Sequence, residues 1–510
     1  MDVDAVGQSL LISTEKRQLG ISSQLNDDER SILGQFFTPL SAATFMASLP
    51  TLPVSGKVRI LDPGAGVGSL SAALVARIAT ECPELAVEVT AVEIDSALKG
   101  ELKQTLIGCH DLGATTRLVE ADFLEWASES VDALSLARSS DRFDLVIMNP
   151  PYRKVNTGTS ERRALKRFNV DVSNLYVAFL AMAAALLDDG GQLTAITPRS
   201  FANGPYFRSF RRYFFENMSF NRLHIFESRS KVFADDAVLQ ENIIFSTTRQ
   251  HPDPSSTVII STSTGVDKAP LCRTVPHSDV VSPDDPDCFV HIVTNEDDAA
   301  ICHAMSLLST RLTTLGLEVS TGRVVDFRAR EYLRSEPAKD TVPLLYQGNL
   351  REGSISWPGS VRKPTSIVAC SATAQQLFPV GTYVLVKRFT AKEERRRVAA
   401  SVFEASDVLT DRVGFENHLN VFHIGGRGID DRLARGLAVW LNSTAVDRYV
   451  RSFNGHTQIN ATDLRRLPYP NEAELLSLGD ALVPGQTSEQ DKIDALVSVH
   501  VKELRNLVAA

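Results

Sequence analysis

The chain has 510 residues, of which 43% are hydrophobic and 23% are charged, and its formal net charge is −9. This composition excludes an intrinsically disordered chain, and no stretch approaches the roughly 20 apolar residues that a membrane span requires. The acidic balance argues against a protein that binds polyanions with its whole surface, although it allows a basic patch on an acidic body. The length predicts two or three domains.

The N-terminus and the cysteines indicate an ordinary cytoplasmic protein. Asp2 and Asp4, close to Met1, do not fit the basic-then-apolar layout of a signal peptide. The six cysteines form no CxxC pair and no Cys/His ligand spacing, so we predict neither a disulfide framework nor a zinc site. We therefore expect no bound metal and no membrane association.

The first half of the chain alternates predicted strands and helices. VRILDPG is a buried strand with a Gly-rich turn, SLSAALVARIAT a helix, LAVEVTAVEID a strand, and RFDLVIM a strand that ends in NPPY. A helix follows in NLYVAFLAMAAALLDDGG, with Gly190 and Gly191 as its stop signal, and then the strand GQLTAITP. This order predicts an α/β fold with a doubly wound parallel sheet that continues to about residue 248.

The composition changes near residue 250, where Pro, Ser, Asp and Gly accumulate as in surface connections. Short β-leaning runs such as TYVLVKRF and LNVFHIG then mix with helical pieces such as LARGLAVWLNS. We predict an N-terminal helical extension over 1–33, the main α/β domain over 34–250, a second mixed α/β domain over 251–485 and a helical tail over 486–510.

The Gly-rich turn after the first strand is a candidate ligand site. Asp62, Gly64 and Gly66 lie between a strand and a helix, where small residues let a ligand approach the backbone and the helix offers free N–H groups. By itself the turn could bind a dinucleotide or be only a tight connection. Glu93, at the end of the second strand, could accept hydrogen bonds from both ribose hydroxyls of a nucleoside cofactor.

A second carboxylate falls at the expected end of the third strand. The Asp122 side chain could accept a hydrogen bond from an adenine amine while Phe123 packs on the ring. Asp122 could equally be a helix N-cap.

The sharpest motif is Asn149-Pro150-Pro151-Tyr152, a rigid loop after the apolar strand FDLVIM. An exocyclic amine conjugated to a ring is a poor nucleophile because its lone pair is delocalised. The Asn149 side-chain oxygen and the Pro150 carbonyl could accept its two hydrogens, and Tyr152 could stack on the base. A plain Pro-Pro turn would explain neither the Asn nor the aromatic.

With these elements in this order, the sequence resembles the gamma class of N6-adenine DNA methyltransferases of bacterial, type II-like restriction-modification systems. The resemblance implies a Rossmann-like class I methyltransferase sheet, S-adenosyl-L-methionine as cofactor, and a target-recognition domain in the second half. It implies that Phe37, Thr38 and Pro39 line the methionine end of the cofactor. It also implies that Phe233 stacks on a flipped-out adenine together with Tyr152.

The implied partner is double-stranded DNA, with a cognate restriction endonuclease encoded separately and a bacterial, nucleoid-associated location. Basic residues are the expected contacts to phosphates and base edges. The candidates are Arg153, Arg199, Arg211, Arg323, Arg328, Lys387 and Arg388. The resemblance suggests a palindromic six-base target of the CTCGAG or CTGCAG type.

Other readings of the same motifs stay open. NPPY also suits methylation of RNA adenines or protein glutamine amides, because a planar amine poses the same chemical problem there. The long second half favours DNA over these. A DNA-binding specificity protein with an inactive fold is a further alternative, and a fused nuclease would need more than the 33 residues that precede the main domain.

Overall fold

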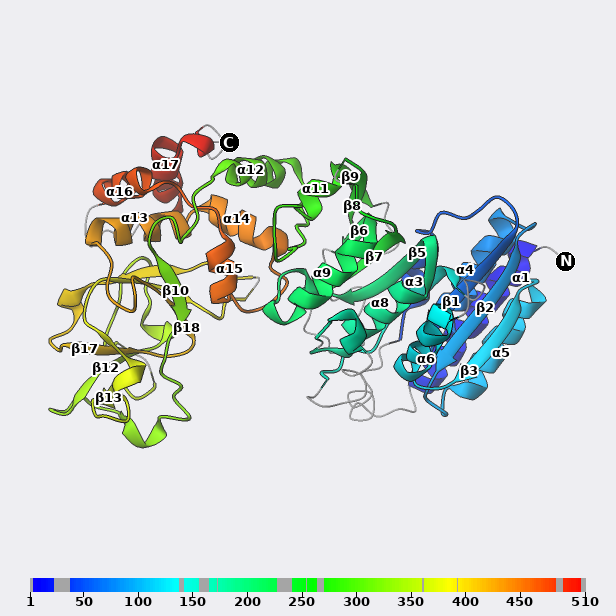
Figure 1. The fold of residues 1–510 in the computed structure, drawn as a ribbon, viewed down its shortest axis with the longest axis horizontal. Helices are drawn as coiled ribbons and strands as arrows, with labels where there is room; N and C mark the ends of the chain where they lie inside the picture. Colours follow the sequence, from blue (N-terminus) through cyan, green and yellow to red (C-terminus); the bar gives the residue numbers. More distant parts are fainter. Residues whose placement is uncertain are drawn as a thin grey trace. The chain divides into compact units, whose positions relative to one another are not determined.

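The computed structural model describes residues 3–22, 37–136, 142–155, 165–171, 173–226, 241–253, 255–263, 270–359, 362–391, 393–482 and 489–505. The chain divides into two compact units, Met1–Thr294 and Asn295–Ala510. Each unit has its own sheet or sheets and its own hydrophobic core (Figure 1).

A nine-stranded sheet in the order β3-β2-β1-β4-β5-β7-β6-β8-β9 forms the centre of the first unit. Its strands are β1 (Lys57–Pro63), β2 (Ala86–Glu93), β3 (Thr115–Glu120), β4 (Phe143–Met148), β5 (Leu187–Pro198), β6 (Met218–Phe226), β7 (Asn242–Arg249), β8 (Thr257–Ser263) and β9 (Leu271–Pro276). The strands from β3 to β5 are parallel, and β7 runs antiparallel to both β5 and β6.

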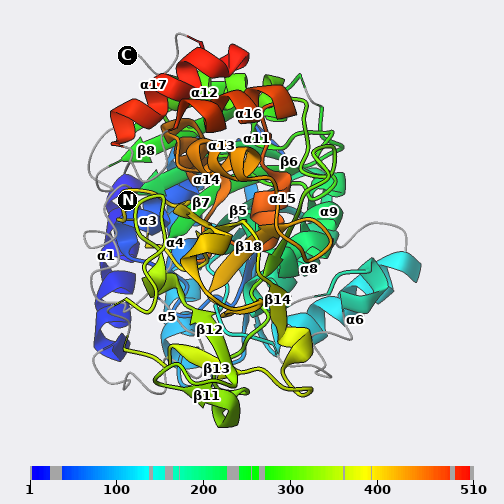
Figure 2. The same ribbon diagram turned by 90° about the vertical axis from the view of Figure 1, so that its left-hand side faces the viewer.

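Helices cover both faces of this sheet. They are α1 (Val3–Ser22), α3 (Leu40–Ala47), α4 (Ser69–Glu81), α5 (Lys99–Asp111), α6 (Phe123–Leu136), α8 (Leu175–Leu186), α9 (Arg208–Asn217) and α11 (His277–Val280), with 3-10 turns at Lys166–Phe168, Arg199–Ala202 and Pro205–Phe207. One core joins α1, α3, α4 and α5 to the sheet, and the other joins α6, α8 and α9 (Figure 2). Neighbouring β1 residues Ile60 and Leu61 serve opposite cores, as strand alternation requires.

The expected α/β sheet is present, with two differences. Gly190 and Gly191 lie inside β5 and do not end α8, which ends at Leu186. An added Cβ on Gly191 would stand 3.0 Å from the Phe143 carbonyl oxygen, at the point where the β4–β5 register shifts. Gly191 therefore permits a close strand approach, and the glycine pair is not a helix stop.

The first unit also extends beyond the boundary that we placed near residue 250. It continues to Thr294, because β8 pairs with β6 and β9 pairs with β8 at the edge of the sheet. The N-terminal extension belongs to it as well, since α1 packs on α4 and α5 and buries Leu10.

A buried histidine on β6 gives this unit a pH-dependent stability. His224 is 1% exposed, its ring nitrogens lie 2.9 Å from Ser261 Oγ and 3.2 Å from Ser263 Oγ, and its ring packs on Phe45. Burial, together with the nearby Arg222 charge, lowers its pKa from 6.5 to about 4. The folded protein therefore favours the neutral form of the His224 ring.

We expect the free energy of unfolding to fall as the pH is lowered from about 6.5 to about 4, because only the unfolded chain binds the His224 proton in that window. The contribution is complete above the unfolded pKa and amounts to about 3 kcal/mol at most. Urea unfolding of wild type and His224→Gln at several pH values tests this. The difference between the two proteins should shrink toward acid, and a constant difference would contradict the assignment.

The second unit holds two sheets and a group of helices. One sheet has the order β10-β18-β15-β16 and the other β11-β13-β12-β17-β14. The strands are β10 (Glu318–Thr321), β11 (Leu333–Arg334), β12 (Thr341–Leu345), β13 (Ser366–Val368), β14 (Leu377–Pro379), β15 (Tyr383–Lys387), β16 (Ala400–Phe403), β17 (Arg412–Phe415) and β18 (Leu419–His423).

The helices of the second unit lie mostly at its C-terminal end. They are α12 (Glu296–Leu307), α13 (Asp431–Leu441), α14 (Thr444–Phe453), α15 (Ala461–Arg466), α16 (Glu472–Ala481) and α17 (Gln490–His500), with 3-10 turns at Arg330–Tyr332, Gln347–Asn349, Ala374–Gln376, Ala405–Asp407 and Lys502–Leu504. Helix α13 begins at the N-cap Asp430, whose carboxylate accepts from two backbone N–H groups. It packs on β15, β16 and α16. Among the described residues, no helix has the length and apolar character needed to span a bilayer.

Candidate active site

Glycines in the turn between β1 and α4 let its backbone fold tightly. Gly64, Gly66 and Gly68 have φ values of 72°, 60° and 85°, in the region that side chains rarely adopt. Gly68 has a packing reason as well, since an added Cβ would stand 2.9 Å from Thr105 Cγ2 on α5. The turn is held to β2 by a 2.8 Å hydrogen bond from Gly64 N–H to the Val92 carbonyl.

The Glu93 carboxylate lies beside this turn, at the end of β2. Its Oε2 accepts a 2.8 Å hydrogen bond from Gly66 N–H, and its Oε1 accepts one of 2.8 Å from Asp95 N–H. Burial raises the pKa of this carboxyl, while the backbone donors oppose the rise. Each oxygen still has a second lone pair, so the carboxylate can also accept from a ligand.

Asp62 is buried at the end of β1. Its Oδ2 accepts from Ser71 Oγ at 2.6 Å and from Ser71 N–H at 3.2 Å. Its Oδ1 is buried without a hydrogen-bond partner in the described part of the chain. Burial raises the pKa of this carboxyl to about 7, and the Ser71 bonds limit the rise. A buried acceptor without a donor is costly unless a ligand or water supplies one.

Asp122 caps the N-terminus of α6, which is the second of the two roles expected for it from the sequence. Its Oδ1 accepts from Leu124 N–H at 2.8 Å and from Glu125 N–H at 3.1 Å. The other carboxylate oxygen of Asp122, Oδ2, takes no part in these capping hydrogen bonds. Phe123 is buried, with its ring centroid 4.8 Å from that of Phe179.

Two aromatic side chains flank the Gly-rich turn. An added Cβ on Gly64 would stand 3.4 Å from Phe179 on α8, and one on Gly66 would stand 3.9 Å from Phe37. Phe37 and α8 thus approach the turn together, and Phe179 connects the turn to Phe123. The sequence analysis missed Phe179, which lay in a uniformly apolar helix that offered no distinguishing signal.

The NPPY loop follows β4 at the same carboxyl edge of the sheet. Asn149 Nδ2 donates a 3.1 Å hydrogen bond to Thr38 Oγ1, and Thr38 is buried. This hydrogen bond joins the NPPY loop to the segment 37–39 through their polar side chains. The Thr38 hydroxyl accepts from the amide NH₂, which turns the Asn149 oxygen the other way.

Tyr152 stands on the oxygen side of Asn149. Its hydroxyl lies 2.9 Å from Asn149 Oδ1 and 3.2 Å from the Ile196 carbonyl of β5. Its ring meets Tyr176 of α8 edge-on at 6.2 Å, and Tyr176 in turn lies 2.9 Å from Ser200 Oγ. A hydroxyl has one proton and two acceptors compete for it, so donation to Ile196 leaves Asn149 Oδ1 able to accept from a substrate amine.

Two of the basic candidates are corrected. Arg211 is fully buried and donates to the carbonyls of Phe201, Gly204 and Asp287 at 2.9, 2.8 and 2.7 Å. Arg199 is 5% exposed and pairs with Glu241 at 3.2 Å. Both guanidiniums hold loops together inside the first unit and cannot reach DNA phosphates.

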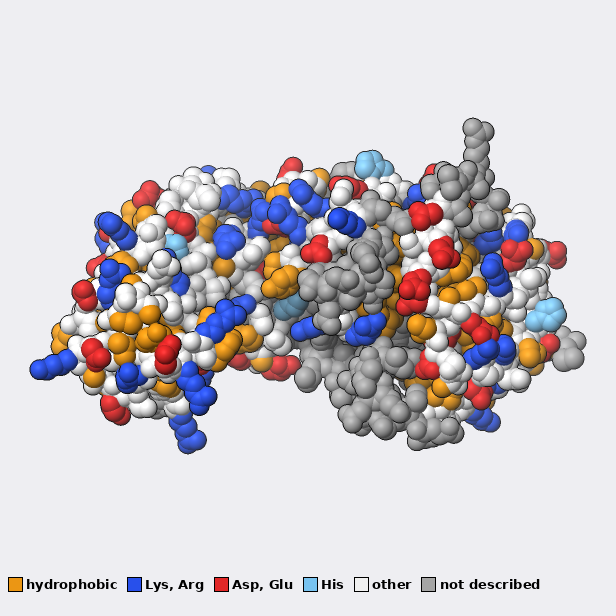
Figure 3. Space-filling model, turned by 60° about the horizontal axis from the view of Figure 1, so that its bottom comes forward, with side chains coloured by type: hydrophobic (Ala, Val, Ile, Leu, Met, Phe, Trp, Pro, Cys, Tyr) orange, Lys and Arg blue, Asp and Glu red, His pale blue; other side chains and the backbone are white. Residues whose placement is uncertain are grey.

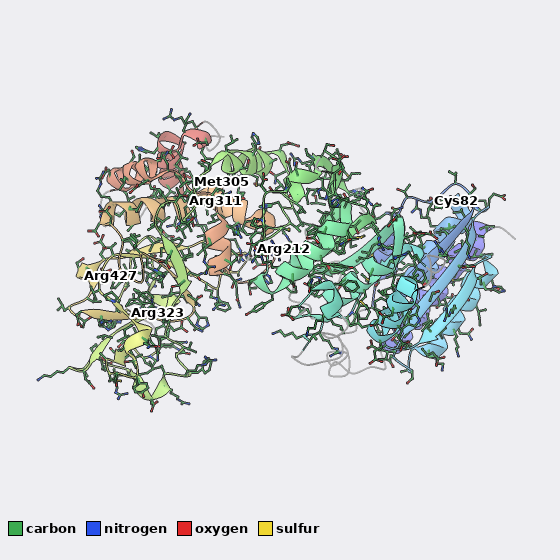
Figure 4. All side chains as sticks on the ribbon, viewed as in Figure 1. Cys82, Arg212, Met305, Arg311, Arg323 and Arg427 are labelled. Atoms are coloured by element: carbon green, nitrogen blue, oxygen red, sulfur yellow. The ribbon has the colours of Figure 1, made fainter. Side chains whose placement is uncertain are left out.

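The other basic candidates keep part of their surface exposed. Arg153 and Arg323 are exposed, and Lys387 and Arg388 are half-buried. The Arg388 guanidinium donates to the Asn417 carbonyl at 3.2 Å and to Gln458 Oε1 at 3.4 Å, and its Nε is buried. Arg212, the neighbour of Arg211 on α9, is also exposed (Figure 4). Phe233 lies outside the described residues. Among the residues that the structure describes, no cluster of three or more His, Cys, Asp or Glu side chains could hold a metal ion.

Comparison with known proteins gives one family match and two relatives that align over nearly the whole chain. A family model described as the Eco57I restriction-modification methylase matches residues 75–233. The chain is 40% identical to the type II methyltransferase M.PstI of Providencia stuartii, over 96% of this chain and 97% of that protein. It is 40% identical to the type II methyltransferase M.BsuBI of Bacillus subtilis, over 96% and 98%. A tRNA1(Val) (adenine(37)-N6)-methyltransferase of Enterobacter sp. is 30% identical, over 30% of this chain and 55% of that protein.

Proposed function

The chain belongs to the type II DNA methyltransferases of restriction-modification systems, and from this premise we propose that it methylates the N6 amine of adenine in duplex DNA. The observation that carries the proposal is the arrangement of Asn149, Tyr152 and Thr38 at the carboxyl edge of the sheet. Their hydrogen bonds orient one acceptor oxygen beside an aromatic ring, next to the Gly-rich turn.

The cofactor is S-adenosylmethionine, and the residues of the turn fit it. Gly64 and Gly66 keep the backbone open to a ligand, and the Glu93 oxygens can accept from ribose hydroxyls. The unpartnered Asp62 Oδ1 can accept from the ammonium group of the methionine part. Bound there, the sulfonium supplies an electrophilic methyl group.

The residues of the NPPY loop would activate the amine. Asn149 Oδ1 and the Pro150 carbonyl accept its two hydrogens, which draws the nitrogen toward tetrahedral geometry and restores its lone pair. Tyr152 holds the base by stacking, so that the lone pair faces the methyl group. The nitrogen forms a bond to the methyl group as the sulfonium carbon–sulfur bond breaks, and the positively charged product then loses one of its two protons to water.

Adenine inside a duplex cannot reach this loop, so the proposal includes base flipping. Phe233, in the segment between β6 and β7, would be the second stacking residue. Arg153, beside the loop, would bind a phosphate, and Arg323, Lys387 and Arg388 of the second unit would contact the backbone or bases. The proposal also includes a palindromic six-base target of the CTCGAG or CTGCAG type, a separately encoded endonuclease and a nucleoid-associated place in the bacterial cytoplasm.

An N6-adenine RNA methyltransferase is the second candidate, since a tRNA enzyme shares part of the sequence. That similarity covers 30% of the chain, whereas the similarity to type II enzymes covers 96% and includes the second unit. DNA is therefore the favoured substrate.

The test is methyl transfer from labelled S-adenosylmethionine to unmethylated duplex DNA, tRNA and a glutamine-containing peptide, with digestion of the product to nucleosides. We expect N6-methyladenine in DNA alone. Methylcytosine in DNA would overturn the adenine assignment, and label in RNA or peptide alone would overturn the DNA assignment.

A further inference from the structure

A loop of the second unit presents an aromatic side chain to solvent. Residues 322–332, here the Phe327 loop, connect β10 to β11. Phe327 stands in the middle of this loop with 71% of its surface exposed. Isolated exposed apolar residues are common, so the exposure of Phe327 carries no functional conclusion by itself and the surroundings of the ring have to be considered.

The ends of the Phe327 loop are fixed to the core. Val324 is fully buried and Ala329 is 2% exposed. Val324 N–H donates to the Phe415 carbonyl at 3.1 Å, and its own carbonyl accepts from Asn417 N–H at 2.9 Å. The tip is a tight turn, in which Arg328 and Ala329 both donate to the Val325 carbonyl at 3.0 Å.

A charged pair fixes the backbone of Phe327 itself. Asp326 Oδ1 accepts from Phe327 N–H at 2.7 Å, and Asp326 Oδ2 lies 2.8 Å from Lys363 Nζ. The Lys363 ammonium holds the pKa of Asp326 below its usual value. Lys363 also lies 5.0 Å from the Tyr346 ring centroid. These contacts order the loop without covering the Phe327 ring.

Two arginines of the Phe327 loop are exposed, and one of them, Arg328, lies near the Phe327 ring. The Arg328 guanidinium lies 5.5 Å from the Phe327 ring centroid, and that of Arg323 lies 4.0 Å from the Phe378 centroid. Both arginines are exposed, and neither has an acidic partner among the described residues (Arg323 in Figure 4). The other carboxylate of the loop, Glu331, faces the Tyr332 hydroxyl and raises its pKa.

The second unit offers an instructive comparison in Leu409. This side chain is fully exposed but stands between Asp407 and Asp411. The charged residues closest to it in the sequence are therefore acidic, whereas the Arg328 guanidinium lies near the Phe327 ring. On the face drawn in Figure 3, Lys and Arg side chains of the second unit project beside exposed hydrophobic ones.

We propose that Phe327 is an aromatic wedge that packs into the base stack of bound DNA, with Arg328 on a flanking phosphate and Arg323, from the start of the same loop, on the DNA backbone. A loop whose backbone is already ordered loses little conformational entropy when its tip inserts. Apolar wedges of this kind unstack a base step and kink the duplex, and stacking on a base is favourable whatever its identity. The proposal rests on DNA as the substrate of the proposed function.

Fluorescence anisotropy with duplexes that carry a methylation site mapped for the wild type tests this directly. We expect Phe327→Ala to weaken binding about tenfold or more and to leave the salt dependence unchanged. Phe327→Trp should keep affinity within about threefold. Arg323→Ala and Arg328→Ala should each lower the slope of log affinity against log salt by about 1. Leu409→Ala is the matched control, and end-to-end energy transfer in labelled duplexes reports the kink.

The results of these measurements either support the wedge or contradict it. Loss of affinity and of the kink in Phe327→Ala, with normal S-adenosylmethionine binding, supports the wedge. If Phe327→Ala binds and bends DNA as Leu409→Ala does, the wedge is wrong while methylation of DNA by the wild type still stands. If the wild type methylates no DNA, the proposed function and the wedge fail together.

Discussion

Asn149→Ala is expected to lower kcat for methyl transfer by about 100- to 1,000-fold while leaving the affinity for S-adenosylmethionine close to that of the wild type. In the proposed mechanism, the Asn149 side chain supplies the oxygen that accepts from the amine, and this contact strengthens as the nitrogen becomes tetrahedral. The proposed cofactor residues Glu93 and Asp62 do not depend on Asn149, since they are held by backbone donors and by Ser71. Single-turnover kinetics and calorimetric titration of the cofactor measure the two quantities.

Two further variants separate the role of the acceptor oxygen of Asn149 from the role of side-chain packing. Asn149→Asp keeps an acceptor oxygen, and the Thr38 hydroxyl can reverse its role and donate to the new carboxylate. This variant should retain at least about tenfold more activity than Asn149→Ala. Tyr152→Phe keeps the ring and removes the hydroxyl that lies 2.9 Å from Asn149 Oδ1, so it should affect kcat less than Tyr152→Ala. An equal kcat in Asn149→Ala and wild type would show that Asn149 takes no part in the reaction.

The strand-end residues of this site could be predicted from the sequence because parallel strands end at one edge. β1, β2 and β4 bring Asp62, Glu93 and Asn149 to that edge, and the alternation of strands and helices in the sequence indicates the arrangement. The contact between Thr38 and Asn149 could not be predicted in this way, since it joins side chains 111 residues apart. The contact between the Tyr152 hydroxyl and the Ile196 carbonyl could not be predicted either, because every residue has a backbone carbonyl and the sequence does not single one out.

Charge alone misled the sequence analysis at Arg211. The run of arginines in RSFRRYFFEN reads as a basic surface, yet Arg211 shares a helix face with the buried Phe207, Phe214 and Phe215. Spacings of three and four residues from these phenylalanines were the available signal. A guanidinium has five donors and can be buried where several loop carbonyls point at it, as those of Phe201, Gly204 and Asp287 do.

The unit boundary shows a related limit. Pro and Ser after residue 249 correctly indicate a turn, but β8 and β9 return to the same sheet. Local composition reports where a chain turns, whereas the partner of the next strand is decided by packing elsewhere. The second unit, with its two small sheets, has strands too short for periodicity to predict their order.

The crossing of α13 and α16 in the second unit depends on two glycines. An added Cβ on Gly436 would stand 1.8 Å from the Leu475 carbonyl oxygen, and one on Gly479 would stand 2.0 Å from the Arg432 carbonyl oxygen. Both obstructing atoms are backbone, so neither can move aside by rotating a side chain. The helices can therefore lie this close only because both positions lack a side chain.

Gly436→Ala is accordingly expected to lower the free energy of unfolding of the second unit by about 2 kcal/mol or more. Overpacking against backbone costs about 1–3 kcal/mol and occasionally more, while Ala gains at most about 1 kcal/mol over Gly in a helix. Hydrogen exchange measured by mass spectrometry should show faster exchange in α13 and α16 and unchanged exchange in β1 to β4. Urea unfolding followed by the fluorescence of Trp440, which is buried on α13, should show a lower midpoint.

Gly100→Ala on α5 is the control, because nothing lies within 4 Å of an added Cβ there and its φ is not positive. That variant should be neutral or stabilising by at most about 1 kcal/mol. A second variant, Gly479→Ala, should reproduce the loss at Gly436, and the double variant should lose less than the sum, since one separation of the helices relieves both contacts. If Gly436→Ala were as stable as Gly100→Ala, α13 and α16 would have to be further apart than the structure places them, and the close crossing would be wrong.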